Sequence, residues 1–206
     1  RYYAPNNAIL VVAGDVTPEE VKNHAVETFG KLPANPAAPR AARPADPPQR
    51  VARRVMLEDP RAGKASIHRD YLVPAYATAA PLEAEALDLL AKIALDGPTS
   101  RLYKKLVVEE KVASSTGGSY MGSGLDSGKF SLYAVAADGT DLTKVESAMD
   151  AVLAEVAANG VTAAELERAK NGYVAEYIYE NDNQASLARR FGWGLSLGRS
   201  IAQIES

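Results

Sequence analysis

A proline-dense stretch limits how the two sides of this chain can fold together. Its six prolines within residues 32–49 are Pro33, Pro36, Pro39, Pro44, Pro47 and Pro48. Proline removes backbone donors and favours extended polyproline geometry. We therefore expect residues 33–50 to be a semi-rigid linker between a first domain at 1–32 and a second at 51–206. The alternative is a ligand for a recognition module, which depends on the PxxP spacing of Pro33 with Pro36 and of Pro44 with Pro47.

The composition is that of a folded soluble protein and excludes several function classes. With 206 residues, 47% of them hydrophobic and 24% charged, the chain can bury a sizeable core. A net charge of −3 without a basic stripe argues against nucleic acid as a partner. No apolar run approaches the roughly 18 residues that span a bilayer, so a membrane partner is not expected. The absence of cysteine fits bacterial cytoplasm and periplasm alike.

The first domain has the pattern of a strand followed by a helix. Residues 9–13 are a continuous apolar run bounded by turn residues, which is typical of a strand covered on both faces. Thr17 and Glu20 form a capping-box pattern that begins a helix, and Gly30 ends it. Because the chain opens on aromatic and apolar residues without a methionine, we expect 1–32 to be the remnant of a larger domain.

The second domain alternates strands and helices. Apolar periodicity and turn signals predict strands at 51–57, 66–73, 112–120 and 129–137, and helices at 81–95, 100–110, 142–158, 162–181 and 184–195. This order favours an α+β fold in which helices cover one face of an antiparallel sheet. Tyr173, Tyr177 and Trp193 fall on apolar helical faces, which favours core packing over a ligand box.

The residues that could carry chemistry do not converge. His24 and His68 lie on different sides of the linker, and neither has the spacing or carboxylate partner of a helical zinc site. Residues 117–118 and 122–128 are glycine-rich in a strand or hairpin setting, which indicates a turn or a bulge. Glu109 and Glu165 belong to a solvated face and a helix cap. The residues themselves predict no catalytic group and no metal ligand in this chain.

Three segments, in this order and spacing, resemble the pitrilysin/insulinase zinc metallopeptidases, whose metal site is His-x-x-Glu-His. They are Tyr2-Tyr3-Ala-Pro-Asn-Asn-Ala-Ile-Leu-Val-Val-Ala-Gly-Asp15, then Ser100-Arg101-Leu102-Tyr103 with Leu106 and Glu110-Lys111-Val112-Ala113, then Gly160-Val-Thr-Ala-Ala-Glu-Leu-Glu-Arg-Ala-Lys-Asn171. The resemblance runs nearly end to end and implies the metalloendopeptidase type of α+β fold.

The resemblance implies a longer parent protein built from two related domains, with its zinc site upstream of this chain. Residues 1–32 would then be the C-terminal strand–helix remnant of the metal-bearing domain, and residues 51–206 would be a second, non-metal domain that is truncated at its C-terminus. No His-x-x-Glu-His occurs here, so the chain alone should not hydrolyse peptides. We expect it to form part of the wall of a peptide-enclosing cavity. The expected partners are a peptide substrate, the metal-bearing domain, and a second peptidase-like subunit or a second copy. The alternatives are a non-catalytic scaffold subunit and a generic α+β binding module.

A second family feature concerns an arginine and a tyrosine that approach the substrate from the non-metal half. The resemblance places these positions at Val107 and Ser114, neither of which can donate as arginine or tyrosine would. This departure implies either that the parent is a metal-bearing subunit whose partner supplies the pair, or that it is a degenerate member without activity. The sequence favours the metal-bearing subunit.

Overall fold

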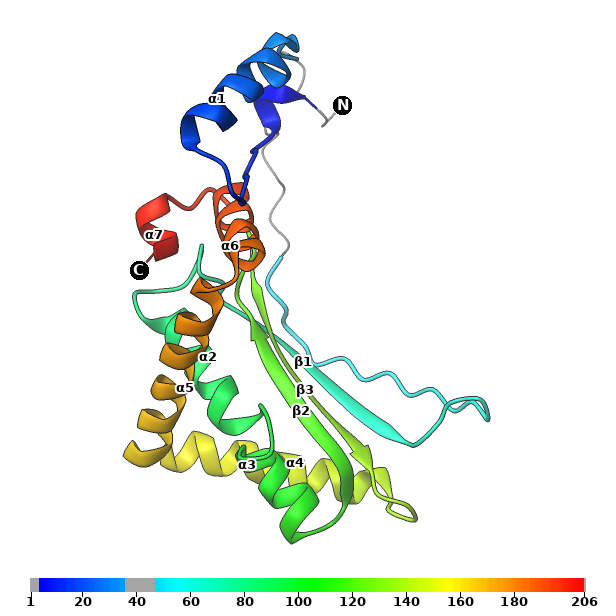
Figure 1. Cartoon of the computed structure of the whole chain (residues 1–206). Helices are drawn as coiled ribbons and strands as arrows, with labels where there is room; N and C mark the ends of the chain where they lie inside the picture. The colour runs from blue at the N-terminus through cyan, green and yellow to red at the C-terminus, as the bar shows by residue number, and fades with distance from the viewer. Residues whose placement is uncertain (1–3, 36–46, 206) are drawn as a thin grey trace. The chain divides into compact units, whose positions relative to one another are not determined.

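A computed structural model describes residues 4–35 and 47–205 and divides the chain into two compact units. The terminal unit consists of Arg1–Asp46 with Val174–Ser206, and the sheet unit is Pro47–Tyr173. Figure 1 shows the elements of both, and each unit is described by itself. The central part of the expected linker, residues 36–46, lies outside the described residues.

The sheet unit is built on three antiparallel strands, β1 (Ser66–Val73), β2 (Ala113–Met121) and β3 (Gly128–Ala136). Their order is β1-β3-β2, so β3 is central (Figure 1). The register sets His68 and Gly117 opposite the same β3 residue, Tyr133. A β-bulge interrupts the pairing of β2 between Ala113 and Ser115.

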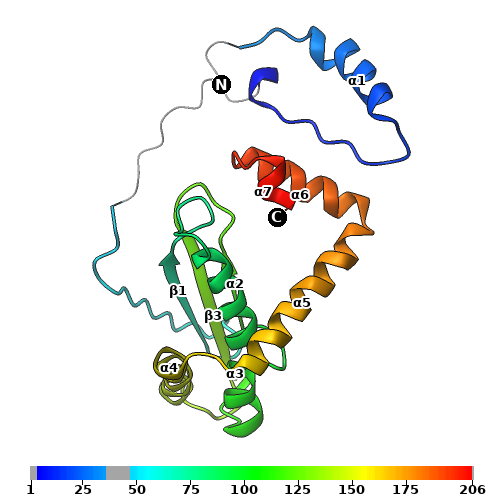
Figure 2. The ribbon, with the colours of Figure 1, turned by 90° about the vertical axis from the view of Figure 1, so that its left-hand side faces the viewer.

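Helices cover one face of this sheet, which confirms the predicted α+β class (Figure 2). The covering elements are α2 (Glu83–Ala94), α3 (Arg101–Tyr103), the π-helix η3 (Lys104–Glu109) and α4 (Leu142–Asn159). Their apolar side chains bury the even-numbered residues of β3 in one hydrophobic core, whose largest fully buried members are Leu95, Leu102, Leu106, Leu132, Met149, Val112 and Val145. Burial of this size is the main stabilising contribution to the unit.

The remaining elements are short helices and the long helix α5 (Ala163–Asn181), which the unit boundary at Tyr173 divides. The terminal unit contains η1 (Pro5–Asn7), α1 (Pro18–Glu27), η2 (Phe29–Lys31), α6 (Gln184–Ser196) and α7 (Ile201–Glu205). Both predicted capping boxes are confirmed: Thr17 pairs with Glu20, and Thr162 pairs with Glu165. None of the helices in the described ranges is long and apolar enough to cross a membrane.

The predicted strand at residues 9–13 is wrong. This segment is extended but pairs with no strand among the described residues, and Ile9, Leu10 and Val12 are about half exposed. A β-rich run forms a strand only when a neighbouring strand accepts its backbone hydrogen bonds and covers its side chains. The terminal unit provides no such neighbour within its described part.

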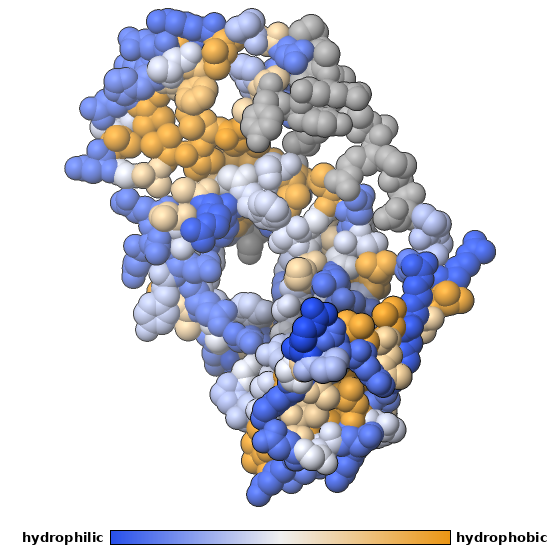
Figure 3. All heavy atoms as spheres, turned by 90° about the vertical axis from the view of Figure 1, so that its right-hand side faces the viewer, coloured by the Kyte–Doolittle hydropathy of each residue, from blue (hydrophilic) through white to orange (hydrophobic). Residues whose placement is uncertain are grey.

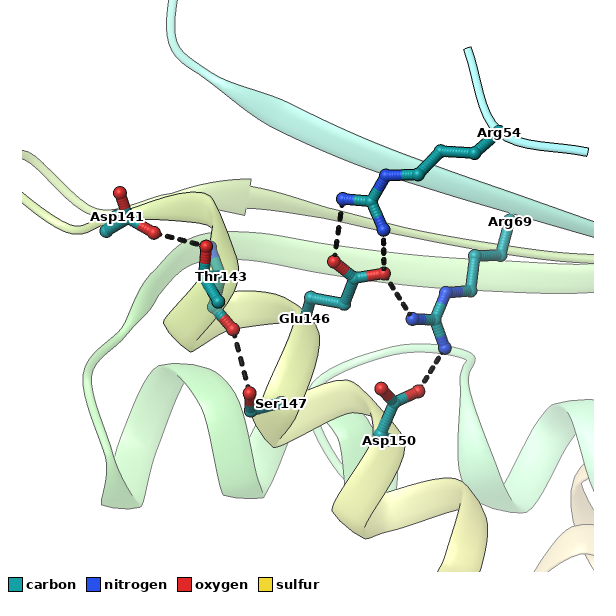
Figure 4. Close-up of polar contacts among 7 residues, drawn as sticks. All are labelled: Arg54, Arg69, Asp141, Thr143, Glu146, Ser147 and Asp150. Atoms are coloured by element: carbon teal, nitrogen blue, oxygen red, sulfur yellow. Dashed lines mark hydrogen bonds and ion pairs between the residues drawn. The ribbon is translucent and has the colours of Figure 1, made fainter. Parts of the chain in front are cut away.

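The predicted strand at 51–57 is also wrong, because nothing in the described sheet unit buries its side chains. Val55 is 93% exposed, and the segment has no ladder partner in the described ranges. Its attachment is electrostatic: Arg54 forms two hydrogen bonds of 2.8 and 2.9 Å with Glu146 of α4. Figure 4 shows Arg69 of β1 sharing the same carboxylate and pairing with Asp150. The ion pairs fix the segment's position without making it a strand.

Two further expectations differ from the structure. The single helix predicted at 100–110 is one turn of α-helix followed by the π-helix η3, in which the Glu110 amide donates to the Lys105 carbonyl. This π-type hydrogen bond closes a longer ring than the bond of an α-helix does. Lys111, whose φ of 54° is left-handed, follows the π-helix before β2 begins. Tyr177 and Trp193 are 44% and 59% exposed, so the core packing predicted for them is not formed in the described structure.

Candidate functional site

The face of the sheet opposite the helices carries many polar side chains. Alternation along the strands sends every second side chain to this open face. Its members are Ser66, His68, Asp70 and Leu72 of β1, Ser115, Gly117, Ser119 and Met121 of β2, and Lys129, Ser131, Tyr133 and Val135 of β3. Serine and charged residues are frequent in this set, whereas the helix-covered face is mostly apolar, with Phe130, Leu132 and Ala134 buried in the core. The open face is therefore a surface suited to hydrogen bonding.

A hollow of about 390 Å³ lies at β2, and its lining combines residues of the open face with residues of the helix-covered face and of the loop after α2. It is lined by His68, Asp70, Asp96, Gly97, Thr116, Gly117, Gly118, Ser119, Ser131, Leu132 and Tyr133. The volume is at the lower end of the range for ligand pockets. The lining contains two carboxylates, an imidazole, a phenol and several hydroxyls, and no lysine or arginine.

Aromatic rings form one wall of the hollow. The rings of His68 and Tyr133 stack with centroids 5.6 Å apart and planes inclined by 21°. The Tyr133 ring leans over β2, where a side chain at Gly117 would come within 2.8 Å of it. Glycine at position 117 therefore allows the ring to lie flat across the strand. This arrangement leaves the backbone of β2 open beside an exposed aromatic surface.

The carboxylate of Asp70 is oriented by the neighbouring strand β3. The Ser131 hydroxyl donates a 2.7 Å hydrogen bond to Asp70 Oδ1, and Lys129 Nζ lies 3.4 Å from the same oxygen. The hydrogen bond from Ser131, together with Lys129, holds the pKa of Asp70 below its usual value. Asp70 is thus an anionic acceptor at neutral pH.

The structure places Val107 and Ser114 in structural settings. Val107 lies on η3 and packs, half-buried, against the hydrophobic core. Ser114 lies at the β2 bulge, with its hydroxyl 3.4 Å from the carbonyls of Val135 and Ala136. Whether these are the positions of the family's substrate-contacting pair stays a prediction.

The two histidines lie in different units, and His68 lines the hollow together with the carboxylates of Asp70 and Asp96. His24 is exposed on α1 of the terminal unit, and His68 is exposed on β1 of the sheet unit. Within the described residues no group of three histidine, cysteine or acidic side chains is arranged to hold a metal ion. These residues therefore do not fit a zinc site of three or four protein ligands.

Two of the three sequence segments that carry the family resemblance meet at one ion pair. Arg101 Nε and Nη2 donate to the two oxygens of Glu165 at 2.8 and 2.7 Å, and Nη1 donates to Glu155 at 2.7 Å. Glu165 also closes the capping box at Thr162. Ser100, fully buried, caps α3 immediately before Arg101. The two motifs therefore join α3, α4 and α5, and their role in this unit is architectural.

The stability of this junction should depend on pH. The Arg101 hydrogen bonds, with those from Thr162, hold the pKa of Glu165 far below the ordinary 4.5 of glutamate. A depressed folded-state pKa contributes stability that is complete above about pH 5 and is lost as the pH falls below 4.5 toward the folded value. We expect the free energy of unfolding to decrease more between pH 5 and pH 3 in the wild type than in Glu165→Gln, measured by urea titration. Parallel pH profiles would contradict this role.

Sequence reasoning missed the open-face hollow. The glycines at 117 and 118 were expected to mark a turn or bulge, but they lie within β2, and the bulge is at Ala113 and Ser115. The available signal was the alternation of polar residues in β1 and β3, which places His68 and Asp70 beside Tyr133 and Ser131 once the strands are paired. Pairing and register could not be read from one sequence.

Comparison with known families and structures gives a consistent result. Residues 1–173 match the family model described as the peptidase M16 inactive domain. None of the curated proteins matches the chain in sequence. The structure is similar to the crystal structure of a protease from Helicobacter pylori, with a TM-score of 0.85 and 25% identity over 96% of this chain and 47% of that one.

Two other solved structures are also similar. The inactive peptidase domain of a candidate zinc protease from Bordetella parapertussis has 25% identity and a TM-score of 0.58, over 68% of this chain and 74% of that one. A peptidase M16 inactive domain from Pseudomonas fluorescens has a TM-score of 0.69 and 18% identity, over 93% and 44% of the two chains, and shows the common fold. This chain spans about half the length of the Helicobacter pylori protein.

Proposed function

The chain belongs to the peptidase M16 inactive-domain family, and from this premise we propose that it is the non-metal domain of a zinc-dependent peptidase. In this function the domain forms part of the wall of a cavity that encloses the peptide. The zinc ion belongs to the metal-bearing domain of the longer protein, where it supplies the Lewis acid for peptide hydrolysis. The residues of this chain bind and orient the peptide.

The observation that carries this proposal is the open face of the sheet. A cavity wall must accept the main chain of many peptides, which requires exposed hydrogen-bonding groups rather than one tight pocket. Ser119, Ser131 and Asp70 provide such groups, and the glycines of β2 leave its backbone accessible. The helix-covered face is buried in the core and is not free for this role.

The terminal unit carries exposed apolar side chains of the kind that pack against another domain. Figure 3 shows hydrophobic side chains gathered on it, and the exposed members include Ile9, Leu10, Val12, Val16, Val26, Phe29 and Leu32. Exposed apolar groups at this density are typical of an interaction surface. In the proposed function the metal-bearing domain covers them, and a second peptidase-like subunit or a second copy completes the cavity.

A non-catalytic scaffold subunit is the second candidate. Val107 and Ser114 favour it, because neither side chain can make the hydrogen bonds of arginine and tyrosine at the positions that the resemblance assigns to them. In that function the domain supports an active partner, and its open face does not contact peptide.

Photo-cross-linking separates the two candidates. A photoreactive amino acid replaces Ser119 on the open face or, as a matched control, Glu109, which is exposed on η3. The chain is mixed with the metal-bearing half, zinc is removed by chelation so that the peptide is not cut, and labelled peptide is added before illumination. The cavity-wall function predicts labelling at position 119 and little at 109. Equal labelling at both positions, or at neither, would favour the scaffold.

A further inference from the structure

We propose that the hollow on the open face binds an arginine side chain of an extended peptide. This inference rests on the proposed function, because it names the peptide chemistry that one part of the cavity wall selects. The hollow contains three features that together suit a guanidinium group: a flat aromatic surface, carboxylate oxygens, and an edge strand that carries two glycines.

The aromatic surface is the stacked pair of His68 and Tyr133. Tyr133 is 36% exposed, and its ring stacks on His68 and lies across Gly117. A guanidinium is planar and weakly hydrated, so it stacks on such rings more readily than an ammonium does. The pair therefore favours arginine over lysine.

The carboxylates provide acceptors for the guanidinium donors. Ser131 and Lys129 both contact Asp70 Oδ1, and within the described residues no donor reaches Asp70 Oδ2. Across the hollow, Lys92 contacts Asp96 Oδ2 at 3.1 Å. Each carboxylate is thus partly neutralised but keeps one oxygen for a further donor. Neither lysine lines the hollow itself, but both lie next to its carboxylates, so their positive charges weaken the attraction of Asp70 and Asp96 for a guanidinium.

The backbone of β2 is accessible to an extended peptide. β2 is an edge strand of the three-stranded sheet that the structure describes, so its outer side has no ladder partner there. Gly117 and Gly118 present no side chain on either face at the level of the hollow. Thr116 Oγ1 is buried beside them without a hydrogen-bond partner in the described structure. A peptide lying here can place one side chain against Tyr133.

Fluorescence anisotropy on the full 206-residue chain tests the inference. Three labelled peptides of small polar residues differ at the central position, which is arginine, lysine or glutamate. We expect the arginine peptide to bind about tenfold tighter than the glutamate peptide, with lysine between them, because one stack and one partly screened ion pair give an effect of this size. Equal affinity for all three, or no binding of the arginine peptide, would overturn the inference.

Substitutions test whether the preference for the arginine peptide arises in the hollow. Asp70→Asn and Tyr133→Leu should each reduce the arginine preference about threefold, because each removes one of the two interactions. The matched control for the first is Asp138→Asn, since Asp138 is also a surface aspartate paired with a lysine, Lys64. Tyr179→Leu, at a 76% exposed tyrosine, is the control for the second. Controls that lose as much as the test variants would contradict the assignment.

A measurement without substitutions guards against misfolded variants and separates this inference from the proposed function. In NMR titrations the amide signals of Gly117 and Gly118 should shift with the arginine peptide and remain in place with the glutamate peptide. Unmoved glycine signals refute the arginine site, whatever the cross-linking result. The opposite result is also informative. If the glycine signals shift but position 119 is not cross-linked in the complex with the metal-bearing half, the arginine site is supported and the cavity-wall function is contradicted.

Discussion

Gly118→Ala is expected to destabilise the sheet unit strongly. An added Cβ would lie 2.4 Å from the Ser131 carbonyl oxygen and 2.6 Å from Leu95 Cδ1. The carbonyl belongs to the neighbouring strand, and Leu95 is fully buried, so neither can move without breaking the ladder or opening the core. Overpacking of this kind costs about 3 kcal/mol. Urea unfolding followed by circular dichroism measures the loss.

Gly172→Ala is the matched control for this substitution. At Gly172, within α5, an added Cβ meets only Lys92 Cε at 3.8 Å, which is an ordinary contact. Alanine also has the higher helix propensity, so this variant should gain up to about 1 kcal/mol. The pair therefore predicts effects of opposite sign. A stable, native-like Gly118→Ala variant would show that the close packing of Leu95 against β2 is not as described.

Arg101→Ala is expected to destabilise the junction of α3, α4 and α5. The side chains of Arg101 and Glu165 are only 15% and 18% exposed, so removing the guanidinium leaves a largely buried carboxylate without its two main donors. The cost of an unpaired charge that keeps some solvent contact is about 2 kcal/mol, or a decrease in melting temperature of about 4–8 °C. Differential scanning calorimetry measures it.

Two comparison variants test the physical reason. Arg101→Lys keeps the charge but cannot form the two-pronged contact with Glu165, so its melting temperature should lie between those of wild type and Arg101→Ala. Arg54→Ala removes another two-pronged arginine, but its side chain is 68% exposed, and the melting temperature should stay within error of wild type. An equal decrease for Arg54→Ala and Arg101→Ala would contradict the importance of burial.

The elements whose signals are local were predicted well. The capping boxes at Thr17 and Thr162 begin α1 and α5 as expected, because the interacting groups lie three residues apart. The apolar periodicity likewise predicted the helix at 142–158, and Val145, Met149 and Val152 of α4 are buried. The alternation of strands and helices was sufficient for the α+β class.

The elements that depend on distant neighbours were not predictable in the same way. Residues 9–13 and 51–57 have strand-like composition but lack pairing strands in the described structure, and composition contains no information on that. The sequence predicted that Glu165 belongs to a helix cap, and the structure confirms this. Its second interaction, with Arg101, spans 64 residues and was invisible to local patterns.

The candidate hollow could not be predicted from the sequence for the same reason. Its residues come from three strands and a loop, and their assembly depends on the register that sets His68 and Gly117 opposite Tyr133. The family resemblance, which the comparisons confirm, directed attention to Val107 and Ser114 instead. The open-face groups come together only when the three strands are paired in this register.

The central claim is that this chain is a peptide-binding domain whose parent places the catalytic zinc elsewhere. The most direct test is zinc analysis of the purified chain together with hydrolysis of a fluorogenic peptide, with and without a chelator. We predict substoichiometric zinc and no chelator-sensitive cleavage. About one tightly bound zinc ion per chain, with peptide cleavage that the chelator abolishes, would contradict the account.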